Sequence, residues 1–140
     1  MKPLASILLD ELRATLNLPP PPKRVLIVED DANFATVMME SLNEGGCAVE
    51  VADTPDKAVA MVAATIPFTR IFLDLKFEGE QTGVFALKRI RQMFPTMPIT
   101  VLSGFVSDEF EKVARDDYHI DVRRKPVDVA ELQAMVAATV

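Results

Sequence analysis

Short apolar runs alternate with amphipathic segments along most of the chain. The first run, residues 25–28 (VLIV), is apolar at every position, as is typical of a strand that is buried on both faces of a parallel sheet. Similar runs predict four further strands, at 48–52, 70–73, 98–102 and 120–123. The last of these runs is the least apolar and predicts the weakest strand.

The segments between the runs place apolar residues at helical spacing. Two of them begin with good capping residues, because Asp31 is a natural N-cap and Thr54 is followed by Pro55 in the first turn. Asp128 and Glu131 resemble a capping box. The pattern therefore predicts helices at 31–43, from 54, at 84–94, around 109–115 and from 128.

Five strand–helix units in succession predict an α/β fold with a doubly wound, five-stranded parallel sheet and helices on both of its faces. At this length, the flavodoxin-like strand order 2-1-3-4-5 fits best. We expect these units to form one domain over residues 23–140.

The first 22 residues follow a different pattern. Leu4, Leu8, Leu12 and Leu16 recur at every fourth position, which predicts an added amphipathic N-terminal helix, and four prolines at 19–22 end it with a stiff linker. We expect 1–22 to be a separate segment. Its leucine stripe fits a homodimer seam, a segment that docks on the sheet domain, or a frayed leader.

Composition narrows the function. The 140 residues carry a net charge of −6, which argues against a nucleic-acid partner, and 49% of them are hydrophobic. No apolar stretch approaches the roughly 20 residues of a membrane helix, and the start does not resemble a secretory signal. Cys47 is the single cysteine, so it forms no internal disulfide, and we expect a cytoplasmic protein.

Polar side chains follow the predicted strands at their carboxyl ends. Glu29 and Asp30 follow the first strand, Asp74 the third, Ser103 the fourth and Lys125 the fifth. In a doubly wound sheet, ligands bind at this edge near the switch in strand order. We therefore expect these side chains to share one site.

Three carboxylates in one site call for a cation. Two unit charges about 5 Å apart repel by roughly 3 kcal/mol at an effective dielectric constant near 20. Lys125 offsets part of this repulsion, and an all-oxygen ligand set suits Mg²⁺ for the remainder. A carboxylate beside Mg²⁺, a lysine and a hydroxyl is the arrangement that phosphoryl transfer to aspartate requires.

These residues resemble the receiver domain of two-component response regulators. The matching pieces occur in the family's order over residues 23–140: VLIVEDD at 25–31, IFLDLK at 71–76, Gly83, ITVLSG at 99–104 and Lys-Pro at 125–126. The resemblance implies that Asp74 is the phosphoacceptor. It also implies that Glu29, Asp30, Asp74 and the backbone carbonyl of Lys76 bind Mg²⁺.

The same resemblance gives Ser103 the role of gripping the phosphoryl group and Lys125 that of binding another of its oxygens, with a cis bond before Pro126. The chain departs from the family at two places. Val122 stands where the family has an aromatic switch residue, and the loop after Asp74 is acidic and one residue longer, with Gly83 nine positions on. Because Lys76 and Phe105 stand at the positions that tune hydrolysis, we expect a long-lived phosphoryl group.

The function implied is that of a stand-alone response regulator, not an enzyme, which receives a phosphoryl group from a histidine kinase or phosphotransfer protein. Nothing after the last predicted helix remains for an output domain, so we expect an effector to be reached by protein contact. The alternative is a pseudo-receiver that binds proteins without phosphorylation. A flavodoxin is not expected, because EDDANF (29–34) stands where its Ser/Thr/Gly-rich phosphate loop would follow the first strand. A dehalogenase-type hydrolase is not expected either, because Lys76 stands where it would have a second aspartate.

Overall fold

The computed structural model describes residues 2–19, 21–64, 67–75, 80–104 and 106–139, with the side chains of 80–82 left out. The strands are β1 (Arg24–Val28), β2 (Ala48–Ala52), β3 (Arg70–Asp74), β4 (Ile99–Ser103) and β5 (Asp121–Arg124). The helices are α1 (Leu4–Thr15), α2 (Ala32–Glu44), α3 (Pro55–Ala64), α4 (Glu80–Met93), α5 (Asp108–Tyr118) and α6 (Val129–Ala138).

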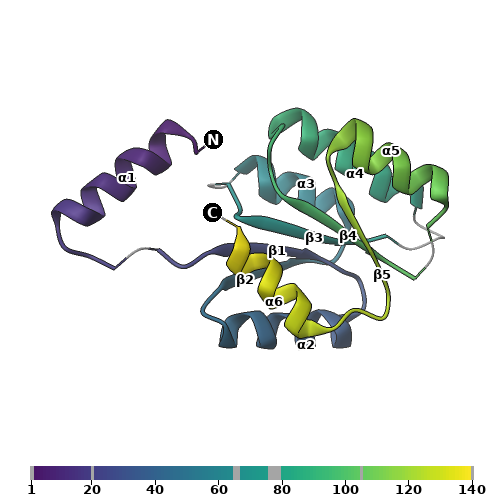
Figure 1. Ribbon diagram of the computed structural model, residues 1–140, viewed down its shortest axis with the longest axis horizontal. Coiled ribbons are helices and arrows are strands. Elements are labelled where there is room, and N and C mark those ends of the chain that lie inside the picture. Colours follow the sequence, from purple (N-terminus) through teal and green to yellow (C-terminus); the bar gives the residue numbers. More distant parts are fainter. Residues whose placement is uncertain (1, 20, 65–66, 76–79, 105, 140) are drawn as a thin grey trace.

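The five strands form one parallel sheet in the order β2-β1-β3-β4-β5, which confirms the predicted order. Helices cover both faces, with α2 and α6 on one and α3, α4 and α5 on the other (Figure 1). Consecutive residues of β1 serve opposite faces: Val25 and Ile27 pack with α2 and α6, and Leu26 and Val28 with the other three helices. Burial on both faces explains why this run is apolar throughout.

The N-caps predicted for two helices, Asp31 and Thr54, are present in the structure. The Asp31 carboxylate accepts hydrogen bonds from the backbone N–H groups of Asn33 and Phe34, and the Thr54 hydroxyl accepts one from Lys57. Capping leaves these first-turn donors satisfied and fixes where each helix begins after its strand.

The capping box predicted at 128–131 is half formed. Asp128 caps α6 by accepting a hydrogen bond from the Ala130 N–H. The Glu131 carboxylate, however, lies 3.1 Å from a guanidinium nitrogen of Arg123 on β5. The ion pair thus ties the start of α6 to the preceding strand.

The helix predicted at 84–94 begins earlier than expected, because α4 already starts at Glu80 and Gly83 lies inside it. A Cβ atom at Gly83 would collide with the Leu75 side chain. Glycine therefore allows the first turn of α4 to lie directly against the Leu75 side chain, just after β3.

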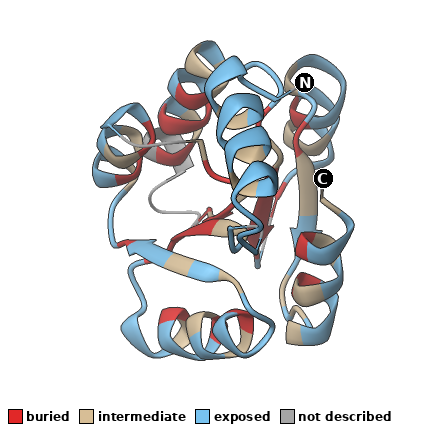
Figure 2. Cartoon of the chain, turned by 90° about the vertical axis from the view of Figure 1, so that its left-hand side faces the viewer, coloured by how far each residue is buried: buried red, intermediate tan, exposed pale blue. Residues whose placement is uncertain are grey.

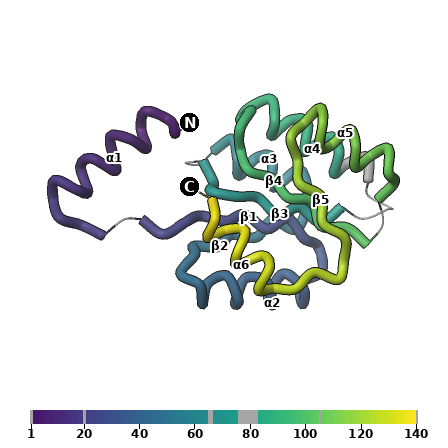
Figure 3. Tube along the Cα trace, in the orientation of Figure 1, coloured from purple at the N-terminus to yellow at the C-terminus, as the bar shows by residue number. Residues whose placement is uncertain are grey.

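The N-terminal helix lies apart from the sheet domain, at the end of the linker (Figures 1 and 3). Figure 2, in which α1 is nearest the viewer, shows buried residues along the sheet and the inner sides of its helices and none on α1. Among the described residues, no helix is long and apolar enough to span a bilayer.

Candidate functional site

The carboxyl edge of the sheet brings the predicted site residues together. Asp74 ends β3 and pairs in register with Leu102, so that it lies beside the end of β4, where Ser103 follows. Glu29 follows directly on β1, the other neighbour of β3. Lys125 follows directly on β5. The strand order thus converts widely separated positions in the chain into neighbours.

The three acids form a compact cluster. Glu29, Asp30 and Asp74 each offer a carboxylate oxygen, and these oxygens lie within 4.8 Å of one another. Glu29 is only 4% exposed and so is the Asp74 side chain, whereas Asp30 lies open to solvent. One side of the cluster is therefore walled by protein and the other is open to an incoming group.

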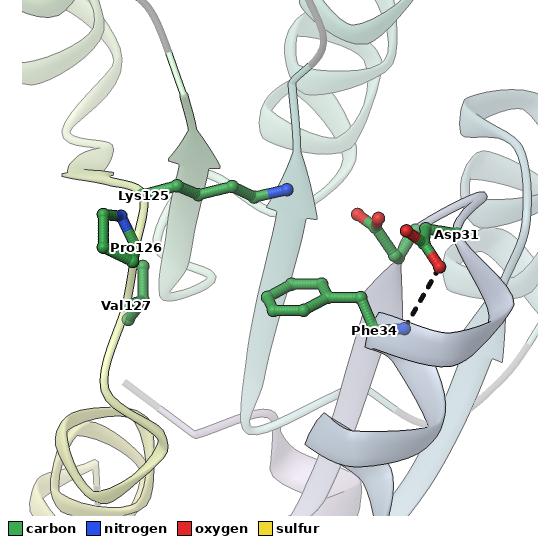
Figure 4. Close-up of a pocket in the computed structure, with 6 residues that line it drawn as sticks. Asp31, Phe34, Lys125, Pro126 and Val127 are labelled. Carbon is green, nitrogen blue, oxygen red and sulfur yellow. Dashed lines mark hydrogen bonds between the residues drawn. The ribbon is translucent and has the colours of Figure 1, made fainter.

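Lys125 supplies the opposing charge. Its ammonium lies 2.7 Å from Oδ1 of Asp74, and it sits 4.7 Å from the centroid of the Phe34 ring. Figure 4 shows the lysine side chain extended from the end of β5 across the strand ends, toward the side on which Phe34 lies. The Lys125–Pro126 bond is cis, as the resemblance implied.

Phe34 is the residue that sequence reasoning missed. It falls within the helix predicted at 31–43, for which no site role was expected, but it lines a cavity of about 500 Å³ at the edge of the site (Figure 4). The available signal was its position three residues after the N-cap Asp31, because a first-turn side chain there faces the strand ends. The other residues that line it are Glu29, Asp31, Lys125, Pro126 and Val127.

The Ser103 hydroxyl is buried and donates a 2.8 Å hydrogen bond to the backbone carbonyl of Leu75, the residue after Asp74. The Ser103 carbonyl in turn accepts a 2.7 Å hydrogen bond from the backbone N–H of Lys125. Ser103 therefore joins the ends of β3, β4 and β5, and its hydroxyl lies next to the cluster in a backbone-bound position.

Asp53, the acid at the end of β2, stays outside the cluster. It forms a 2.8 Å ion pair with Lys57 one turn into α3, and the hydrogen bond from Lys57 lowers the pKa of the Asp53 carboxyl. The Mg²⁺ ligand expected at Lys76 and the position of Phe105 lie outside the described residues. Val122, at the position of the family's aromatic switch, is half-buried on β5 and packs against the core beneath α3, α4 and α5.

Comparison with known proteins finds relatives of this chain. The chain is 27% identical over 110 residues to the transcriptional regulatory protein ZraR of Escherichia coli K12, a match that covers 79% of this chain and 24% of that protein. It is 28% identical over 110 residues to the response regulator receiver protein Anae109_2439 of Anaeromyxobacter, covering 79% and 45%. The chain thus spans about a quarter to under half of these relatives' lengths.

Solved structures show the same fold. The CheY-like receiver domain protein from Methanospirillum hungatei JF-1 superposes with a TM-score of 0.75 at 24% identity, over 83% of this chain and 91% of the other. The chemotaxis protein CheY4 of Vibrio cholerae gives 0.74 at 21%, over 85% and 99%. The model of the response regulator receiver domain matches residues 25–137, and the chain therefore belongs to that family.

Proposed function

We propose that this chain accepts a phosphoryl group on Asp74 from a histidine kinase or phosphotransfer protein and passes the signal on by protein contact. The observation that carries the proposal is the cluster at the carboxyl edge of the sheet. There, three carboxylates lie within 4.8 Å of one another and the Lys125 ammonium lies 2.7 Å from Asp74.

The residues present fit a bound Mg²⁺. Glu29, Asp30 and Asp74 offer only oxygen ligands, the type that Mg²⁺ prefers, and their oxygens are close enough together to share one ion. The exposed side of the cluster leaves room for the waters that Mg²⁺ retains. A bound Mg²⁺ would supply positive charge against the phosphoryl oxygens. The carbonyl of Lys76 remains a proposed fourth protein ligand.

The protein's own groups perform the transfer. An Asp74 carboxylate oxygen attacks phosphorus, the P–N bond to the donor histidine breaks, and its electron pair stays on the imidazole nitrogen. Lys125 neutralises charge on the phosphoryl oxygens, because its ammonium already sits beside Oδ1 of Asp74. The Ser103 hydroxyl, held by Leu75 in this structure, turns to donate to a phosphoryl oxygen.

Output by contact is proposed to use the surface formed by α5, β5 and α6. Val113 on α5 is exposed, and Phe110 on α5 and Val122 on β5 are partly buried, so these elements offer apolar contact area. A change in Ser103 reaches it through the hydrogen bond from Lys125 N–H to the Ser103 carbonyl, since Lys125 directly follows β5.

A pseudo-receiver that binds partners without phosphorylation is the second candidate. Val122 favours it. The family's switch relies on an aromatic ring that moves between two positions, and a half-buried valine has no such ring. Acetyl phosphate with MgCl₂, followed by intact-mass measurement, separates the two functions. We expect an adduct of about 80 Da in the parent chain and in Asp53→Asn, and none in Asp74→Asn. An unmodified parent chain would leave the pseudo-receiver as the function.

The phosphoryl group is proposed to be long-lived, as Lys76 and Phe105 led us to expect. The decay of the adduct after removal of acetyl phosphate measures this. A half-life of seconds in the purified protein with Mg²⁺ would contradict it.

A further inference from the structure

Helix α1 presents an apolar face that no described part of the chain covers. Its large apolar side chains are between 40% and 71% exposed, and none of its residues is buried. Figures 1 and 3 show the helix standing away from the sheet domain. The exposed side chains are Leu4, Ile7, Leu8, Leu9, Leu12 and Leu16.

The leucines lie together on one side of this helix. At 100° per residue, Leu4, Leu8 and Leu12 follow one another around it and Leu9 and Leu16 lie beside Leu12, in a sector roughly 140° wide. Ile7 falls outside the sector. A 12-residue helix is marginal by itself in water, so a partner on this face would stabilise α1 as a helix.

The sheet domain offers no matching surface among the residues described. Its exposed large apolar side chains are single residues on four different elements. They are Val37 on α2, Val51 on β2, Phe85 on α4 and Val113 on α5. None of these elements presents several exposed large apolar side chains to match the leucine face, so docking on its own domain gains little.

A membrane surface is also a poor match. Helices that lie on membranes carry an excess of Lys and Arg on their polar face. Here the acids Asp10 and Glu11 balance the bases Lys2 and Arg13, and Lys2 already pairs with Asp10 at 2.9 Å. Anionic lipid would gain no net attraction from this segment.

A second copy of α1 does match. The two polar borders of the leucine face differ in charge, with Glu11 on one and Arg13 on the other. In a parallel twofold pair, the Glu11 border of each helix lies against the Arg13 border of its partner, whereas an antiparallel pair sets like borders together. We propose that the chain forms a parallel homodimer through α1.

Size and linker are compatible with this pairing. Covering the leucine faces of two short helices removes on the order of 1,000 Å² of surface from water, at the low end for specific interfaces, so the dimer is a weak one.

The Pro-rich linker spans about 3 Å per residue and keeps apart two domains that each carry negative charge. Arg13 also donates to the Pro19 carbonyl, which fixes the helix end to the linker.

Sedimentation equilibrium of the full chain from about 5 to 300 µM tests the pairing, with no phosphoryl donor present. We expect the mass to rise toward twice 15.4 kDa. The double variant Leu8→Glu/Leu12→Glu is expected to remain monomeric, and Ala14→Glu, on the polar side of α1, to dimerise like the parent. A monomeric parent chain, a larger assembly, or a dimer that survives the double variant would overturn the proposal.

Charge exchange tests the orientation. Arg13→Glu places two acids at each border and is expected to raise the dimer dissociation constant about threefold or more, and Glu11→Arg/Arg13→Glu to restore it. If the exchanged pair is no better than Arg13→Glu alone, parallel pairing is wrong. Circular dichroism and unfolding of each variant confirm that the sheet domain is intact, so a failure of this proposal is distinct from a failure of phosphoryl transfer.

Discussion

The Lys125 ammonium lies 2.7 Å from the Asp74 carboxylate, whose side chain is 4% exposed. At an effective dielectric constant near 20, this attraction amounts to roughly 6 kcal/mol, and each repulsion from Glu29 or Asp30 at up to 4.8 Å to roughly 3.5 kcal/mol or more. The two kinds of interaction nearly cancel at Asp74. The charge balance of the site therefore depends on the lysine.

Lys125→Gln is expected to lower the free energy of unfolding by about 2 kcal/mol in EDTA, because it removes the positive charge that lies 2.7 Å from the buried Asp74 carboxylate. Asp74→Asn, which removes attraction and repulsion together, is expected to change it by less than about 1 kcal/mol. The double variant should recover most of the loss. Urea unfolding of all four proteins measures the cycle, and additive effects of the two substitutions would show that the pair is not coupled.

Mg²⁺ is expected to stabilise the fold, since the carboxylate cluster exists only in the native state. At 100 times its dissociation constant, a ligand of the native state adds about 2.7 kcal/mol to the free energy of unfolding. Thermal unfolding with and without MgCl₂ measures this.

Asp30→Asn is expected to weaken the Mg²⁺ effect strongly, because Asp30 is the solvent-facing member of the cluster. Asp53→Asn is the matched control, since Asp53 ends a strand at the same edge but pairs with Lys57 outside the cluster. An equal Mg²⁺ response in the two variants would place the ion elsewhere.

The sheet and the cluster could be predicted because they depend on local patterns that the topology then combines. Residues 25–28 are apolar throughout because both sides of β1 are covered, and together with the five successive strand–helix units this indicates a parallel sheet. Once the strand order is known, Glu29, Asp74 and Lys125 meet at one edge. No distance had to be known to expect them there.

What could not be predicted depends on contacts between distant segments. To predict that α4 starts at Glu80, one must know that Gly83 packs against Leu75. To predict that Glu131 pairs with Arg123, one must know where β5 lies. Phe34 was missed for the same reason, because its place over Lys125 follows from the relative position of α2 and β5. Such contacts leave no periodic signal.

Phe34→Leu is expected to slow phosphorylation of Asp74 by acetyl phosphate about two- to fivefold, because the ring's face holds the Lys125 ammonium near the acceptor. Phe34→Tyr keeps the ring and should react at the parent rate. Phe85→Leu is the control for losing an aromatic side chain, since Phe85 is exposed on α4. Intact-mass time courses give the rates, and equal rates for Phe34→Leu and the parent would remove Phe34 from the site.

Lys23→Met is expected to lower the free energy of unfolding by about 1–2 kcal/mol. The Lys23 ammonium donates to the carbonyls of Val136, Ala137 and Thr139 at 2.7–3.0 Å, so it caps the end of α6 from the start of the domain. Lys57→Met, which removes one exposed ion pair, should change stability by less than about 0.5 kcal/mol. Urea midpoints compare them, and similar losses in both variants would contradict the capping role.

Cys47 is expected to react slowly with thiol reagents near neutral pH. Burial raises the pKa of its thiol, while the nearby Lys23 charge lowers it by less. A raised pKa keeps the thiol protonated at pH values where an ordinary cysteine, with a pKa of about 8.5, has begun to ionise, so the rate of alkylation should rise only at higher pH. Rates of iodoacetamide alkylation from pH 7 to 10 measure the midpoint, and the same chain unfolded in urea provides the reference. A native midpoint at or below that of the unfolded chain would show that the Lys23 charge outweighs burial at this site.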